Sequence, residues 1–262
     1  NQTIMKLHKL TLCALALMGA IACNDGGEDI NSVKGALVFD MDANQNVEEV
    51  TRASISAVTG YTAPTKEKFT FTVTNDDGYD VWSGKIGDLA EGKLVLDAGT
   101  YSVKAVYNEG SIGSPVFEGE IVDGVTINGG ADTEVVVPVS LVNSIVKIEF
   151  DQMFAGYYDW TDFTLKSVGG DKVLTYGANQ TNGVFVNNTA LTVSTKLTSQ
   201  AQDTNFASKS IDFEKEFSIA SGKCYTLKFK ASNIGNGGSI TIEFGDQPEE
   251  VIDMDIEVNP AE

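Results

Sequence analysis

Apolar and polar residues alternate in many segments of this 262-residue chain, and no segment carries an apolar stripe at helical spacing for a useful length. Phe69, Phe71 and Val73 alternate with threonines, and Asn75–Gly78 supplies the turn residues of a hairpin. A period of two places successive side chains on opposite faces of a strand. The chain is therefore predicted to be built from half-buried strands.

Short strands separated by turn residues at close spacing are typical of β-sandwiches and barrels. The pattern repeats in outline in two halves of about 110 residues, a common domain size, and Gly222–Phe229 echoes Gly99–Ala105. We predict an all-β fold of two tandem β-sandwich domains, at residues 34–144 and 145–262. Cys224 lies in an apolar strand and is expected to be a small buried hydrophobe.

The first 22 residues have the layout of an export signal. A short basic stretch precedes the apolar run Leu10–Ile21, which is shorter than the about 20 residues that span a membrane. Ala20 and Ala22 then stand before Cys23, an arrangement that resembles a bacterial lipobox. It predicts cleavage before Cys23 and lipidation of its thiol. The alternative is an ordinary secretory signal.

Residues 23–33 form an acidic stretch with nothing to bury, and we interpret them as the tether behind the lipid. Acidic residues at this place resemble the surface-export signal of Bacteroidetes lipoproteins, although a plain solvated linker has the same composition. The expected location is the outer membrane, lipid-anchored and exposed at the cell surface.

Charge and residue counts exclude much chemistry. The formal charge is −19, with 37 acidic and 18 basic residues, which argues against nucleic acid as a partner. The only histidine, His8, would leave with the signal, as would Cys13. The mature chain would then lack the usual base for a nucleophile and the usual zinc ligands. We expect no enzymatic activity and no cofactor.

Two weaker patterns suggest ligands. Asp40, Asp42 and Asn44 place oxygen ligands at alternate positions, which partly resembles a calcium loop. Gln45 replaces the turn glycine of such a loop, and Thr51 stands where the bidentate glutamate would be. The alternative is a solvated polar segment.

Four aromatic residues could stack on sugars. The candidates are Trp82, Tyr157, Tyr158 and Trp160, the last three in a segment expected to be a loop between strands. This interpretation makes the chain a glycan-binding outer-membrane lipoprotein of a polysaccharide-uptake system. The alternative is that the rings pack in the core or at the domain junction.

Several motifs in order resemble those of the Bacteroidetes fimbrillin-like lipoproteins, and more narrowly of a domain-of-unknown-function relative linked to cell adhesion. The matching segments are Cys23 with its lipobox, Thr51–Ala53, Ala98–Ala105, Val142–Ile148 and Ser239–Glu243. The resemblance implies two tandem transthyretin-like, Greek-key β-sandwiches. It also implies a non-catalytic adhesin or pilus accessory or anchor subunit, whose partners are other pilus or surface subunits, or a host or glycan ligand.

The same resemblance gives a role to Arg52, the only arginine in the chain. A cut between Arg52 and Ala53 would remove the first strand, Gly35–Asp42, and a strand of another subunit, such as Val251–Val258, would fill the groove. Anchor members keep their lipid without a cut, and Arg52 could instead balance nearby glutamates. A structural coat protein with no specific ligand is a further alternative.

Overall fold

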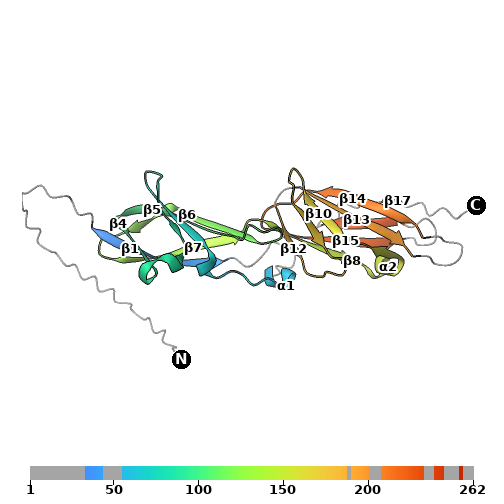
Figure 1. The fold of residues 1–262 in the computed structure, drawn as a ribbon, viewed down its shortest axis with the longest axis horizontal. Helices are drawn as coiled ribbons and strands as arrows, with labels where there is room; N and C mark the ends of the chain where they lie inside the picture. The colour runs from blue at the N-terminus through green and yellow to red at the C-terminus, as the bar shows by residue number, and fades with distance from the viewer. Residues whose placement is uncertain are drawn as a thin grey trace, which may run out of the picture. The chain divides into compact units, whose positions relative to one another are not determined.

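The structure is a computed structural model (Figure 1) that describes residues 33–43, 55–187, 190–200, 208–232, 239–244 and 254–255. In these residues the fold is almost entirely β, with two short α-helices and three single 3-10 turns. None of the helices in this part of the chain is long and apolar enough to cross a membrane. The strands form two successive groups, which we call the N-terminal sandwich (β1 to β7) and the C-terminal sandwich (β8 to β17).

The N-terminal sandwich consists of β1 (Lys34–Ala43), α1 (Ile55–Thr59), β2 (Thr70–Asn75), β3 (Asp80–Gly84), β4 (Lys93–Asp97), β5 (Gly99–Asn108), β6 (Val116–Ile127) and β7 (Asp132–Leu141). Its strand order is β3-β2-β5-β6-β7-β1-β4. β1 runs parallel to β7 and antiparallel to β4. The first strand is therefore an interior strand of its sheet.

The predicted hairpin is present. Phe69, Phe71 and Val73 have no exposed surface, and β2 pairs with β3 across the turn. The side chain of Asn75 accepts a hydrogen bond from the backbone N–H of Tyr79 at 2.8 Å, which closes the turn. Period-two alternation was thus a reliable guide to this strand.

β6 is a single strand of 12 residues with an irregularity in its middle. The chain passes through Gly124 at a φ of 85°, which glycine tolerates, and the β5–β6 register shifts between Tyr101 and Val103. The irregularity therefore interrupts the β5–β6 ladder without ending β6.

β6 and β7 approach each other so closely that one position must be glycine. A Cβ atom at Gly119 would lie 1.9 Å from the carbonyl oxygen of Pro138. The β6–β7 ladder itself is short and joins Phe117 to Leu141 and Glu118 to Ser140. This β6–β7 ladder connects strands β3-β2-β5-β6 to strands β7-β1-β4 in one seven-stranded order.

The C-terminal sandwich consists of β8 (Ser144–Phe150), α2 (Gln152–Tyr157), β9 (Tyr158–Trp160), β10 (Phe163–Ser167), β11 (Val173–Tyr176), β12 (Val184–Val186), β13 (Leu191–Ser199), β14 (Ser210–Phe217), β15 (Cys224–Ser232), β16 (Ser239–Phe244) and β17 (Met254–Asp255). One sheet has the order β12-β8-β15-β16-β17 and the other β11-β10-β13-β14, with β9 beside β13.

The same arrangement occurs in both halves. β8 lies between a parallel β15 and an antiparallel β12, as β1 lies between a parallel β7 and an antiparallel β4. The order β11-β10-β13-β14 likewise repeats β3-β2-β5-β6. The prediction of two tandem transthyretin-like β-sandwiches is confirmed.

The segment Tyr157–Trp160 is not the loop that the sequence suggested. Tyr157 ends α2, whose start is capped by the Asp151 carboxylate accepting from the backbone N–H of Phe154 at 2.6 Å. The next three residues form β9, which pairs with the end of β13. Two very short elements side by side have no periodicity that a sequence pattern could reveal.

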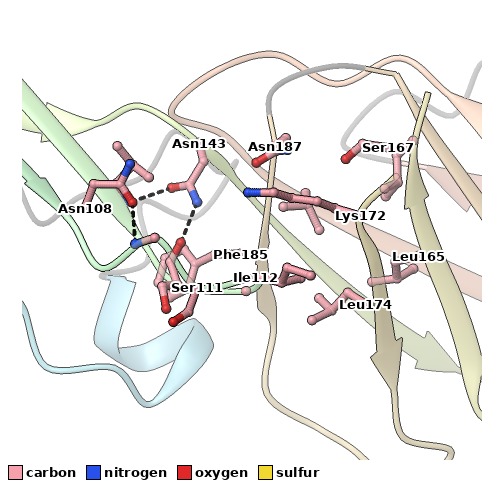
Figure 2. A pocket seen from close by; sticks show the side chains of 16 residues that line it. Asn108, Ser111, Ile112, Asn143, Leu165, Ser167, Lys172, Leu174, Phe185 and Asn187 are labelled. Carbon is pink, nitrogen blue, oxygen red and sulfur yellow. Dashed lines mark hydrogen bonds between the residues drawn. The ribbon is translucent and has the colours of Figure 1, made fainter. Parts of the chain in front are cut away.

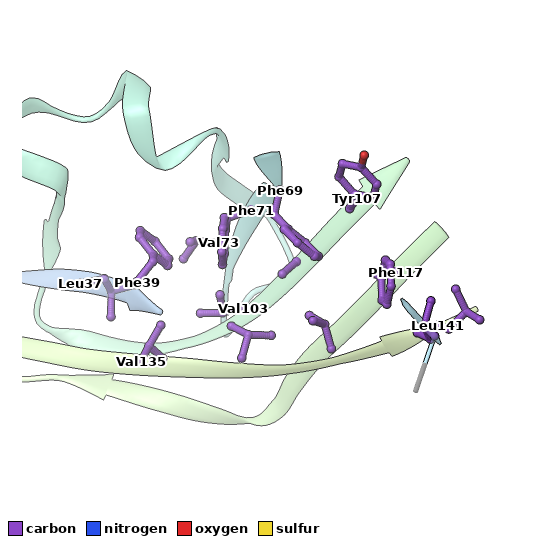
Figure 3. Close-up of a cluster of buried hydrophobic side chains, with 14 of the residues drawn as sticks. Leu37, Phe39, Phe69, Phe71, Val73, Val103, Tyr107, Phe117, Val135 and Leu141 are labelled. Atoms are coloured by element: carbon purple, nitrogen blue, oxygen red, sulfur yellow. The ribbon is translucent and has the colours of Figure 1, made fainter. Parts of the chain in front are cut away.

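The buried hydrophobic side chains of the described residues form two clusters. Figure 3 shows part of the first, in which the ring of Phe39 on β1 lies on the side of Phe71 on β2. Phe154 and Phe229 are central to the second. The first cluster also includes Cys224, which is 7% exposed and buried as predicted.

Candidate assembly site at the first strand

β1 supplies core side chains that no other strand replaces. Leu37 is fully buried and Phe39 is 2% exposed (Figure 3). The ring of Phe39 lies 5.1 Å from that of Phe71 and 5.6 Å from that of Trp82, measured between centroids. Loss of β1 would uncover the apolar side chains that these residues cover.

β4 depends on β1 for its place in the sheet. It is the terminal strand, and within the described residues its ladder is to β1 alone, at Lys34–Val38 opposite Lys93–Asp97. On the other side β1 pairs with Asp132–Val139 of β7 over its residues Ala36–Ala43. A chain without β1 would therefore have a groove between β4 and β7, bordered by unpaired backbone groups.

One ion pair joins the two strands that flank β1. The ammonium group of Lys93 on β4 donates to the carboxylate of Asp132 on β7, with both side chains more than one-third exposed. This hydrogen bond, with the charge of Asp132, raises the pKa of Lys93. We call this pair the β4–β7 clasp, since it links the neighbours of β1 directly.

The predicted processing residues Arg52 and Ala53 lie outside the described residues, but the structure resumes directly behind them. Ile55 and Val58 of α1 are 1% and 8% exposed and belong to the same buried cluster as Ile145 and Phe185. The carbonyl of Val58 also accepts from the backbone N–H of Gly183 at 2.9 Å. The segment after the predicted bond is thus attached to the C-terminal sandwich, within the same buried cluster that contains Leu37 and Phe39 of β1.

The expected donor segment is described only in part. Of Val251–Val258, Met254 and Asp255 form β17, which pairs with β16 at Ser239 and Ile240. The remaining residues of this segment, like the lipidation candidate Cys23, lie outside the described residues.

The four aromatic glycan candidates contact the cores. Trp82 is partly buried against Phe39, and Tyr158 is 5% exposed. Trp160 stacks on Phe150 at 3.8 Å, and its indole N–H donates to the carbonyl of Ala178 at 2.8 Å. Tyr157 is partly buried against the second core. These four residues do not form one exposed row.

Two of the three calcium candidates, Asp40 and Asp42, lie on β1 itself and not in a loop. Asp40 is 3.4 Å from the ammonium group of Lys66 and also accepts from the backbone N–H of Met41. Asn44 lies outside the described residues. In the part of the chain that is described, no three His, Cys, Asp or Glu residues gather as they would around a metal ion.

Two pockets lined by described residues were not predicted from the sequence. The smaller, about 120 Å³, is shown in Figure 2. The side chain of the buried Asn143 in this pocket has a structural role. Its amide nitrogen donates to the carbonyl of Ser114, and its oxygen accepts from the backbone N–H of Val116. The larger is an open cleft of about 610 Å³. Its only sequence signal was the amide-rich run Asn179–Asn182.

A family model described as a domain of unknown function, DUF4493, matches residues 33–260. The chain belongs to this family. Among solved structures, this DUF4493 protein is 13% identical to a fimbrial assembly protein from Parabacteroides distasonis, with a TM-score of 0.43 over 80% of this chain and 94% of that one. It is 10% identical to the fimbrial anchor protein Mfa2 from Porphyromonas gingivalis, with a TM-score of 0.37 over 80% and 97%. No curated protein matches the chain.

Proposed function

We propose that this DUF4493 protein is a surface-anchored, fimbrillin-like lipoprotein that acts without catalysis, as an adhesin or as a pilus accessory or anchor subunit. We further propose that it assembles by strand exchange after a cut between Arg52 and Ala53. The observation that carries the proposal is the place of β1. It is an interior strand, and the chain's only arginine follows it by nine residues, between Ala43 and Arg52.

The anchoring of α1 supports this proposal. After a cut at Arg52, Ile55 and Val58 would stay in their buried cluster, while β1 would be held by its ladders, its core side chains, the ion pair of Asp40 with Lys66, and the β4–β7 clasp. β1 would then be a separate peptide, and a competing strand of similar pattern could replace it.

The C-terminal sequence has such a pattern. Leu37, Phe39 and Met41 recur at every second position of β1, and the proposed donor has Met254, Ile256 and Val258 at the same spacing. Alternate residues of a strand share a face, so a donor in register would present three apolar side chains to the groove.

Edman sequencing and intact mass of the protein recovered from its native cell surface test the proposal. A mature chain that begins at Ala53 supports strand exchange. A chain that begins at an acylated Cys23 overturns the cut while retaining the lipoprotein. A chain that begins at neither residue contradicts both expectations.

Tyr158 is buried, and Trp82 and Trp160 are half-buried with one face on another ring, which supports assembly over glycan stacking by those rings. Glycan binding as part of polysaccharide uptake is better supported at other residues, those of the open cleft.

A further inference from the structure

The open cleft lies between the chain that follows α1 and the connection from β11 to β12. Its lining residues are Thr59, Gly60, Tyr61, Gly113, Asn179, Gln180, Thr181, Asn182, Gly183, Val184 and Phe185. Its volume of about 610 Å³ is in the range of small-ligand sites, about 300–1,000 Å³. We call it the amide cleft.

The amide cleft carries no charged side chain, in a chain with 37 acidic and 18 basic residues. A phosphate, carboxylate or ammonium ligand would find no counter-charge among these residues. The lining therefore favours an uncharged ligand that is rich in hydrogen-bonding groups.

The amides in the cleft have two different roles. Gln180 shapes the connection, since its side-chain oxygen accepts from the backbone N–H of Gly177 and its nitrogen donates to the carbonyl of Asn182 at 2.9 Å. The exposed side chains of Asn179 and Asn182 have no hydrogen bond to any other described residue. Each amide can donate and accept at once, which matches adjacent sugar hydroxyls.

Tyr61 gives the cleft a fixed aromatic ring. Its hydroxyl is 2.8 Å from the hydroxyl of Tyr107, and its ring meets that of Phe185 edge-on, with centroids 5.5 Å apart at 82°. Tyr61 is half-buried, so part of the ring stays accessible. A ring that is already held in place offers an apolar stacking surface at little cost in conformational entropy.

We propose that the amide cleft binds a neutral glycan, with a sugar ring stacked on Tyr61 and its hydroxyls hydrogen-bonded to the side chains of Asn179 and Asn182. This binding goes beyond strand exchange and is independent of it. It uses residues that would remain in the chain with or without a cut at Arg52.

The test uses the purified chain carrying Arg52→Lys, so that assembly does not contribute to avidity. The chain is applied to an array of neutral and sulfated or sialylated oligosaccharides, and the strongest neutral oligosaccharide is titrated by calorimetry. We expect binding to neutral glycans and none to acidic ones. Binding to no neutral glycan, or preference for acidic glycans, would overturn the proposal.

Two sets of variants locate the site. Asn179→Ala with Asn182→Ala removes both amides and their hydrogen bonds to the glycan, so affinity is expected to weaken about tenfold. Asn187→Ala, an exposed amide outside the cleft, is the matched control and should leave affinity unchanged. Equal affinity in the double variant and the control would place binding elsewhere and overturn the proposal.

Tyr61→Phe and Tyr61→Ala separate stacking from folding. Tyr61→Phe keeps the ring and should retain most of the affinity, whereas Tyr61→Ala should abolish binding. Urea unfolding of each variant shows whether the sandwich remains intact. If Tyr61→Ala folds normally and still binds, the stacking role is wrong.

Discussion

The leading strands of the two sandwiches occupy the same place but are attached to the chain in different ways. β8 follows β7 after two residues, and the second of them, Asn143, is hydrogen-bonded to Ser114 and Val116. The hydroxyl of Ser144 also donates to the carbonyl of Ala220 at 2.6 Å. β1 instead precedes residues 44–54, which contain the only arginine.

Under the proposed strand exchange, the release of a strand would depend on its attachment to the chain as well as on its burial. Leu37 on β1 and Ile145 on β8 are both fully buried, so burial does not distinguish the two strands. β8 is held by its neighbours at its first residues and is continuous with β7. A single cut behind β1 would leave that strand held by noncovalent contacts alone.

Each sandwich contains one of the two tryptophans, Trp82 on β3 and Trp160 on β9. The variants Trp160→Phe and Trp82→Phe therefore leave one fluorescent reporter per sandwich. Trp82 also stacks on Phe39 and so reports on β1 itself.

The largest expected effect is from Phe39→Ala. Removal of this buried ring should lower the free energy of unfolding of the N-terminal sandwich by about 3–5 kcal/mol. Urea unfolding followed by Trp82 measures the loss, and Phe229→Ala should act mainly on the Trp160 transition. If Phe39→Ala shifts both transitions equally, the two sandwiches do not unfold as separate units.

Gly119→Ala tests the close approach of β6 to β7, the two strands that connect the halves of the seven-stranded order. The new methyl group would collide with the carbonyl of Pro138, so we expect a loss of about 1–3 kcal/mol in the Trp82 transition. Gly87→Ala, at an exposed site with nothing within 4 Å of the new atom, is the matched control. Equal stability of the two variants would show that the β6–β7 contact is looser than described.

Alkaline pH should weaken the N-terminal sandwich through Tyr107. Burial raises the pKa of this residue above the ordinary 10.0, and hydrogen bonds to Glu109 and Tyr61 raise it further. The folded state then retains a proton that the unfolded state loses. The stabilisation is complete below about pH 10 and decreases as pH rises above it. Urea midpoints across this range should fall less steeply in Tyr107→Phe, and an unchanged slope would contradict this cause.

The smallest effect is expected at the β4–β7 clasp. Lys93→Gln with Asp132→Asn removes an exposed ion pair, so stability should change little. After a cut at Arg52, the β1 peptide should nevertheless dissociate a few-fold faster, as measured by Trp82 fluorescence. Lys104→Gln with Glu118→Gln removes a comparable exposed pair away from β1 and serves as the control. Equal dissociation rates would mean that the clasp does not retain β1.

The sequence predicted the strands of the sandwiches better than their connections. Alternation identified β2 because one face of it is buried, as Phe71 and Val73 show. The similar sequences Gly99–Ala105 and Gly222–Phe229, by contrast, form strands at different positions in their sheets. β5 lies between β2 and β6, whereas β15 lies beside the leading strand β8. A glycine followed by alternation marks entry into a strand but not the position of that strand in a sheet.

The candidate site was predicted only in part. The first strand was placed correctly, because its apolar run is buried on β1. The amide cleft was missed, since it joins Tyr61 to Asn179–Asn182 across more than a hundred residues. Its amides show no periodicity, and only the tertiary fold brings them beside a tyrosine ring.

Native mass spectrometry of the purified protein after treatment with an arginine-specific protease shows whether β1 is exchanged between chains. We expect oligomers of chains that begin at Ala53 and have lost the β1 peptide, while an Arg52→Lys protein treated in the same way stays uncut and monomeric. Monomers that are cut at Arg52 and still retain the β1 peptide would contradict this expectation.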